Sequence, residues 1–361
     1  AKPVVDAASF APFPVHPLPA LSLDAQIPKK GDQRQMEPWQ RLGTYAAGLA
    51  IDHAGARGLV SDMHLVVAAG GGERDVAVDE AVTAALTSAA PEASGALLNE
   101  KLATELRPTL FLAQLSNLLA GNISIVHGVT GSSRTLMGEE EAAADAIRIA
   151  AARLAEGRGE IALVGGAFAS QRWDMVLLYA PGGVLWQGDY APISARGDAG
   201  GLMLGAMAAF LVLETAEHAQ ARGAKALARI GAIASDAAHQ RAGGGSATAA
   251  AALWQGMAPA STAGLGVISG MTGVAEARVE EEAFLATLGG AAVRRSGSVL
   301  GHGVEASFPA NVALAALALS QNGFYPKMDP ADAGDGAVER ILVTGFGQWR
   351  GEALALLEKA P

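Results

Sequence analysis

Cysteine is the most informative absence in this 361-residue chain, which contains none. Its absence excludes disulfide bonds, thiolate-bound metal ions and every reaction that needs a thiol nucleophile. Aromatic residues are also scarce, at 5%, so alanine, valine, leucine and isoleucine must supply the core. Because half of the residues are hydrophobic, the chain can bury a sizeable core in two domain-sized layers or one large duplicated fold.

Long apolar runs and basic charge are lacking as well. No run of about 18 apolar residues is free of charges, and the first ten residues show no charged-then-apolar signal pattern. We therefore expect a soluble cytoplasmic protein. The formal net charge of −10 disfavours binding to nucleic acid or to an anionic membrane.

Patterns that would hold a metal ion or a nucleotide are missing too. The histidines are scattered without metal spacing, and no serine lies in a nucleophile elbow. The glycine-rich stretches 70–73 and 345–347 lack the P-loop and dinucleotide spacings, so we interpret them as turns. We expect neither a metal nor a cofactor.

Hydrophobic periodicity predicts alternating helices and strands after a proline-rich, irregular segment at 1–40. Short apolar runs predict buried strands at 64–72, 160–166, 208–214, 226–234, 265–270 and 340–347. Helical spacing occurs at 39–58, 139–157, 214–223, 276–289 and 302–320, and at 78–122 in pieces that break near Pro91 and Pro108. This alternation in both halves of the chain suggests a duplicated α/β architecture.

Two local features are candidates for a functional site. Glu139, Glu140 and Glu141 stand together at the start of one predicted helix. Acidic residues in a first turn stabilise a helix by roughly 0.3–1 kcal/mol each, so ordinary capping competes with a role at a reaction site. His302 lies between two glycines before another helix, where a neutral ring could donate a hydrogen bond or simply serve as a cap or core contact.

Several segments, taken together, resemble the elongating type of β-ketoacyl-acyl-carrier-protein synthase. Their order and spacing match that family over roughly residues 40–360. The segments are L-S-N-L-L-A-G-N-I-S-I-V-H-G-V-T-G-S-S-R-T (115–135), A-L-V-G-G (162–166), L-M-L-G-A-M-A-A-F-L-V-L-E (202–214), I-A-S-D-A-A-H (233–239) and V-L-G-H-G-V-E-A (299–306). The resemblance implies a thiolase fold: two similar α/β halves, here 1–217 and 218–361, in a five-layer α-β-α-β-α sandwich that works as a dimer.

In this family a cysteine accepts the acyl chain, while two histidines and a lysine support decarboxylation of malonyl-carrier protein. The resemblance places Glu140 at the cysteine position, Ser269 at the first histidine position and Gly297 at the lysine position. Only the second histidine is retained, as His302. Glu280 lies at the spacing downstream of Ser269 where the family has an acidic residue.

The family's final G-F-G-G loop becomes G-F-G-Q-W-R-G here, and it keeps Phe346 and Gly347. A carboxylate cannot form the thioester intermediate, and it would repel a malonyl carboxylate by several kcal/mol at low dielectric. We therefore expect no elongation by this chain alone.

Cys-less members of this family resemble their active partners and act as chain-length factors, in which a Gln often replaces the cysteine. The resemblance thus implies a heterodimer with a Cys-containing ketosynthase in fatty acid, polyketide or polyene biosynthesis. Acyl carrier protein would bind mainly through that partner. The segment 106–117 would line the partner's tunnel, and its candidate gating residues, which could instead only pack the interface, are Thr109, Leu110, Phe111 and Gln114.

Two alternatives remain open at the level of the sequence. Some Cys-less relatives decarboxylate malonyl-carrier protein, although Ser269 replaces one of the two histidines that this chemistry uses. The chain could also be a homodimer that binds acyl groups or carrier protein without catalysis.

Overall fold

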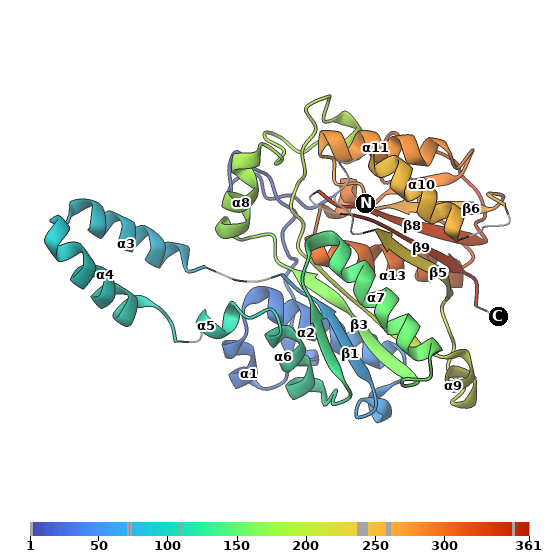
Figure 1. Cartoon of the computed structure of the whole chain (residues 1–361), viewed down its shortest axis with the longest axis horizontal. Helices are drawn as coiled ribbons and strands as arrows, with labels where there is room; N and C mark the ends of the chain where they lie inside the picture. The colour runs from blue at the N-terminus through green and yellow to red at the C-terminus, as the bar shows by residue number, and fades with distance from the viewer. Residues whose placement is uncertain are drawn as a thin grey trace.

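Two β-sheets with helices on every face build the protein (Figure 1). The structure is a computed structural model, and it describes residues 3–360 except 71, 73, 109, 237–244, 258–260, 349 and 350. No helix in these described ranges is long and apolar enough to cross a membrane.

The first sheet has the strand order β2-β1-β3-β4, and the second has the order β5-β9-β8-β6-β7. The strands of the first sheet are β1 (His64–Ala68), β2 (Ser133–Leu136), β3 (Ile161–Phe168) and β4 (Met207–Glu214). Those of the second are β5 (Arg229–Asp236), β6 (Leu265–Ser269), β7 (Ala292–Arg295), β8 (Arg340–Phe346) and β9 (Glu352–Glu358).

The two sheets share one plan. In the first, β2, β1 and β3 run parallel and β4 pairs antiparallel to β3. In the second, β7, β6 and β8 repeat the parallel trio and β9 repeats the antiparallel strand, with β5 added at its edge. No described strand of the first sheet corresponds to β5, and near the start of the chain Asp6 and Val15 form only an isolated bridge. The proline-rich composition of that segment explains why no longer strand forms.

Helices complete a five-layer sandwich, and this confirms the predicted duplicated α/β fold. One outer layer packs on the first sheet, a central pair lies between the sheets, and the other outer layer covers the second sheet (Figure 1). In that order the helices are α2 (Pro38–His53) and α6 (Leu118–His127), α7 (Glu139–Ala155) and α13 (Ser307–Ser320), and α10 (Ser246–Gly256) and α11 (Ala275–Ala286).

The central layer explains why this sequence is rich in alanine and glycine. Helix α7 buries five alanines between the two sheets, where larger side chains would hold the layers apart. On β3, a Cβ at Gly165 would lie 2.1 Å from the carbonyl oxygen of Ala209, and one at Gly166 would lie 2.9 Å from that of Ala68. Close backbone approach therefore requires both glycines. The predicted strand end at Gly166 was wrong, because β3 continues to Phe168.

A helical hairpin, which follows β1 and precedes β2 in the sequence, extends away from the sandwich (Figure 1). It consists of α3 (Val76–Ser88) and α4 (Pro91–Glu105), and neither helix buries a side chain. The predicted breaks near the two prolines are confirmed. The remaining helices are α1 (Lys30–Gln35), α5 (Leu110–Ala113), α8 (Trp173–Tyr179), α9 (Ala216–Ala221) and α12 (Gly297–Leu300). The predicted division between 217 and 218 falls inside α9 and stays a prediction.

Candidate functional site

Two tight turns at the same end of the central layer create the candidate site. Helix α7 begins at Glu139, whose φ is 60°, directly after Gly138, whose φ is 143°. Opposite this turn, the chain passes from α12 through His302 to Val304, whose φ is 45°. Positive φ in a glutamate and in a β-branched valine costs of order 1–3 kcal/mol each, and such backbone clusters at functional sites.

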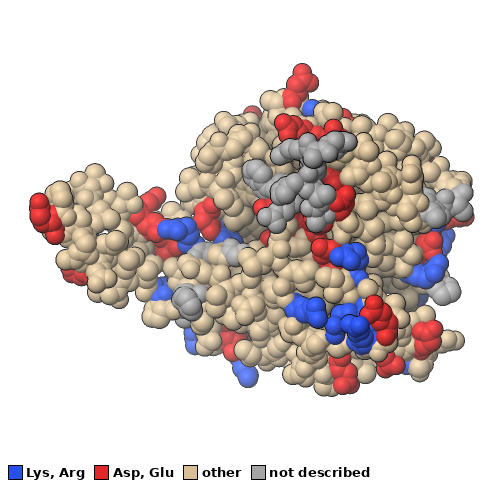
Figure 2. Space-filling model, in the orientation of Figure 1, with Lys and Arg blue, Asp and Glu red and all other residues tan. Residues whose placement is uncertain are grey.

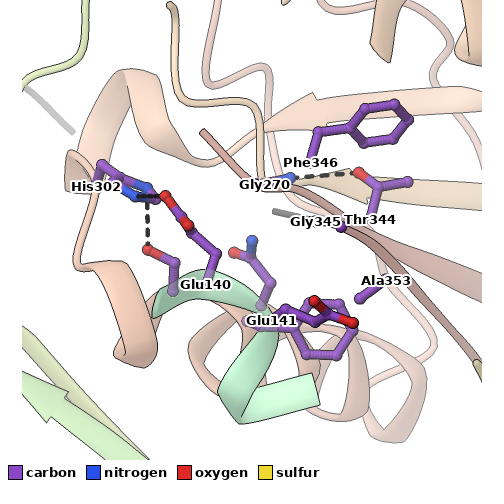
Figure 3. A pocket seen from close by; sticks show the side chains of 13 residues that line it. Glu140, Glu141, Gly270, His302, Thr344, Gly345, Phe346 and Ala353 are labelled. Atoms are coloured by element: carbon purple, nitrogen blue, oxygen red, sulfur yellow. Dashed lines mark hydrogen bonds and ion pairs between the residues drawn. The ribbon is translucent and has the colours of Figure 1, made fainter. Parts of the chain in front are cut away.

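The turns bring Glu140 and His302 into direct contact. Nε2 of His302 lies 2.9 Å from Oε1 of Glu140, and the two side chains point toward one another in Figure 3. Both residues are buried, at 7% exposure for Glu140 and 3% for His302. The other ring nitrogen, Nδ1, lies 3.5 Å from Oγ of Ser307. Glu140 and His302, which the family resemblance places at the nucleophile and second-histidine positions, thus form one buried pair.

Ser269 belongs to a closed hydrogen-bond network. Its hydroxyl donates to Oε1 of Glu281 at 2.5 Å, and the hydroxyl of Thr344 donates to the same oxygen at 2.6 Å. The backbone N–H of Met271 in turn donates to Oγ of Ser269 at 3.2 Å. Glu281 is completely buried, and this burial raises its pKa. A neutral carboxyl here satisfies the two hydroxyls without an uncompensated charge.

The acid that reaches Ser269 is Glu281, one residue beyond the Glu280 suggested by spacing. Oε2 of Glu280 instead accepts a hydrogen bond from the backbone N–H of Ala247, 2.9 Å away in the first turn of α10. Neighbouring residues on a helix point about 100° apart, so only one of the two glutamates can face the sheet. Linear spacing cannot make that distinction.

Gly297 leaves no room for the family's lysine. A Cβ at this position would lie 2.6 Å from the carbonyl oxygen of Met271 and 3.0 Å from Cδ1 of Ile193. A lysine would begin with a backbone clash before its amine could reach any site.

Glu140, His302, Phe346 and Gly347 line a cavity of about 10 Å³. A single water needs roughly 10–15 Å³, so the cavity has room for at most one water. The retained Phe346 also packs against Phe284, with the ring centroids 6.0 Å apart, which fixes this wall of the cavity. Among the described residues, the geometry leaves no space for a substrate between the Glu140–His302 pair and Phe346 and Gly347.

Two further acids are buried here: Glu141, which belongs to the predicted acidic cluster, and Glu305, which sequence reasoning missed. Burial, reinforced by Asp145, Asp236 and Glu352, raises the pKa of Glu141 to about 7. Burial also raises the pKa of Glu305 to about 7, with smaller contributions from the neighbouring glutamates. The only sequence signal for Glu305 was its place three residues after His302. No group of three or more His, Cys, Asp or Glu in the described ranges could hold a metal ion.

The predicted tunnel residues differ in how exposed they are. Leu110 is buried within its own chain, at 5% exposure, whereas Gln114 is exposed just after α5. Thr109 lies outside the described residues, and so does the side chain of Phe111. The gating role of all four stays a prediction.

Comparison with known proteins identifies the family. The model for the N-terminal domain of β-ketoacyl synthases matches residues 19–219, more than half of the chain. The chain therefore belongs to the β-ketoacyl synthase family. Nodulation protein E of Rhizobium leguminosarum bv. trifolii is 35% identical over 114 residues, which are 32% of this chain and 28% of that protein. The chain thus matches less than a third of that relative's length.

Solved structures confirm the thiolase fold over the whole chain. The ishigamide ketosynthase/chain length factor matches with a TM-score of 0.79 at 19% identity, covering 100% of this chain and 92% of that one. The AntDE:AntF complex also matches, with a TM-score of 0.68 at 16% identity, and the match covers 96% of this chain and 90% of that one. That complex is a type II polyketide synthase acyl-carrier protein with its ketosynthase bound to the hexaketide.

Proposed function

We propose that this protein is a non-catalytic, chain-length-factor-like partner of a Cys-containing ketosynthase in fatty acid, polyketide or polyene biosynthesis. The observation that carries this proposal is the buried Glu140–His302 pair beside a cavity of only about 10 Å³. The reaction position is filled by the chain's own side chains, so acyl transfer falls to the partner.

The runner-up chemistry, decarboxylation of malonyl-carrier protein, fits this geometry less well. It needs two donors to stabilise the developing enolate oxygen and room for a malonyl group beside them. Here the hydroxyl of Ser269 is committed to Glu281, and Nε2 of His302 is committed to Glu140. A site with space for one water cannot admit a malonyl group.

The surface of the chain supports an association with another subunit. Helices α3 and α4 have 13 and 15 residues without a buried side chain, and helices of this length are marginal in water when nothing packs on them. Beyond the hairpin, Leu112, Leu115 and Ile125 are exposed, the last at 75%. In the view of Figure 2 much of the hairpin is uncharged, with acidic side chains at its tip and both acidic and basic side chains near its base. Apolar surface of this kind favours burial by a partner.

The nature of the partner follows from the family and from charge. The name of one structural match joins a ketosynthase to a chain length factor, and another match contains a carrier protein with its ketosynthase. The net charge of −10 gives this chain no general attraction to an acidic carrier protein. The carrier would therefore dock mainly on the active partner.

Co-expression with a Cys-containing ketosynthase tests the proposal. We expect a stable 1:1 complex by size-exclusion chromatography, and a malonyl-carrier-protein elongation assay in which product length shifts when Phe111 is changed. The chain alone should neither elongate nor release carbon dioxide. A homodimer that does not bind the synthase but releases carbon dioxide from malonyl-carrier protein would refute the proposal and establish this chain as a decarboxylase.

Replacing Ile125 with aspartate should weaken the 1:1 complex by at least about tenfold, because a charge would be buried in an apolar contact. The matched control is Val279→Asp on α11, where the valine is also exposed, at 57%. Both chains should fold as well as the unchanged protein, since neither side chain packs in the core. Equal dissociation constants for the two variants, measured by biolayer interferometry, would show that α6 lies outside the interface.

A further inference from the structure

A second cavity, of about 340 Å³, opens on the other side of the turn that begins α7. Its walls come from the end of β3, from α8, from the first turn of α2 and from the loop after His302. They are mostly apolar, and Met137 and Leu178, each 64% exposed, stand among them near the surface. The lining side chains that the argument uses are Trp39, Glu139, Arg172, Met175, Tyr179 and Glu305.

Glu305 is the unusual member of this lining. The residue is 95% buried, because its exposure is 5%. Its carboxylate lies against Gly70, where an added Cβ would be 2.6 Å from Oε1. No side chain in the described ranges forms a hydrogen bond or ion pair with it. A buried carboxyl without a side-chain partner is costly, and a ligand that supplies a donor would offset that cost.

The charges around Glu305 favour a cation. Among the described residues of the lining, Arg172 is the basic one, but it is already paired with Asp174 and donates to the carbonyl oxygen of Gly72. Glu139 and Glu140 add negative potential at the carboxylate, and His302 opposes it only in part. An anionic ligand would be repelled from this wall, whereas a protonated amine would be attracted.

We propose that this cavity binds an apolar amine, with its nitrogen at Glu305 and its hydrocarbon body against the apolar walls. The rings of Trp39 and Tyr179 attract cations through their faces in addition to burying apolar surface. Each methylene buried there should tighten binding by about fourfold. The inference concerns binding by this chain alone and goes beyond the proposed role as a partner.

Binding should depend on pH in a defined direction. Burial raises the pKa of Glu305 to about 7, so the carboxyl is mainly neutral at pH 6 and mainly ionised at pH 8. An alkylamine stays protonated throughout this range and prefers the ionised carboxylate. Its affinity should therefore rise about tenfold between pH 6 and pH 8, as the ionised fraction does.

The test is isothermal titration of the full chain with n-octylamine, 1-octanol and octanoate, which share one hydrocarbon length. At pH 8 octylamine should bind at least about tenfold more tightly than octanol, and octanoate should bind most weakly. Glu305→Gln should remove the preference for the amine. The matched control Glu217→Gln, at an exposed glutamate on α9, should leave it unchanged.

Two outcomes would overturn the proposal: equal affinity for octylamine and octanol in the unchanged chain, or a Glu305→Gln variant that keeps the preference. If that variant does not fold, Met175→Trp, which fills the cavity from α8, should abolish octylamine binding. The pH series on the unchanged chain gives a third readout, and an affinity that is flat between pH 6 and pH 8 would contradict the role of Glu305. None of these measurements involves the ketosynthase, so their failure is distinct from a failure of the proposed function.

Discussion

Replacing His302 with alanine is expected to lower the free energy of unfolding by about 3–5 kcal/mol. The substitution removes the partner of Glu140 and leaves a buried carboxylate uncompensated, which is the costly way to break a buried pair. In an active ketosynthase the same histidine would matter for catalysis. Here its loss should act on stability, and the elongation rate of the 1:1 complex should stay within about twofold once the variant is folded.

Urea denaturation followed by circular dichroism measures the effect. The matched control is His53→Ala at the exposed end of α2, which should change stability by less than about 0.5 kcal/mol. The double variant Glu140→Leu/His302→Leu should recover much of the loss, because it removes both polar groups together. A His302→Ala chain that is stable but whose complex has lost elongation would instead place the histidine in the chemistry.

Raising the pH from 6.5 to 8 is expected to destabilise the protein through its buried glutamates. The pKa of Glu305 and that of Glu141 are raised to about 7 in the folded state, above the ordinary value of 4.5. The folded state therefore holds protons that the unfolded state has released, and their stabilising effect is lost as pH rises through 7. For Glu305 the full effect amounts to roughly 3 kcal/mol between pH 4.5 and pH 8.

One group works in the opposite direction at lower pH. Burial lowers the pKa of His16 to about 4, so the unfolded state binds its proton first as pH falls below 6.5. His16 offsets only part of the effect of the two glutamates between pH 4.5 and 6.5, so stability should fall as pH rises from about 5 and level off near pH 8. Glu305→Gln should flatten the decline above pH 6.5, and Glu217→Gln should not. Parallel stability curves for the unchanged chain and Glu305→Gln would show that this carboxyl does not titrate near 7.

The strong local patterns were sufficient to predict most of the long elements, whereas Glu140 and His302 were singled out as a site through the family resemblance. Helix α7 and strand β3 follow from periodicity and glycine, and Glu140 and His302 follow from the spacing of motifs. The short strands β2 and β7, with four residues each, carry too few residues for a periodic signal. That Glu281 rather than Glu280 reaches Ser269, and that Glu305 faces a cavity, depends on how distant elements pack, which no local pattern records.

The close packing around Gly297 makes a change from glycine to a larger residue hard to achieve. Because the carbonyl of Met271 occupies the space where a side chain would begin, no single substitution at this position can introduce the lysine that the family resemblance predicts there. A reversion would require the backbone around α12 to move at the same time. If an ancestor of this protein was an active synthase, the change to glycine let the surrounding backbone close in, and selection acting on one residue at a time could no longer reopen it.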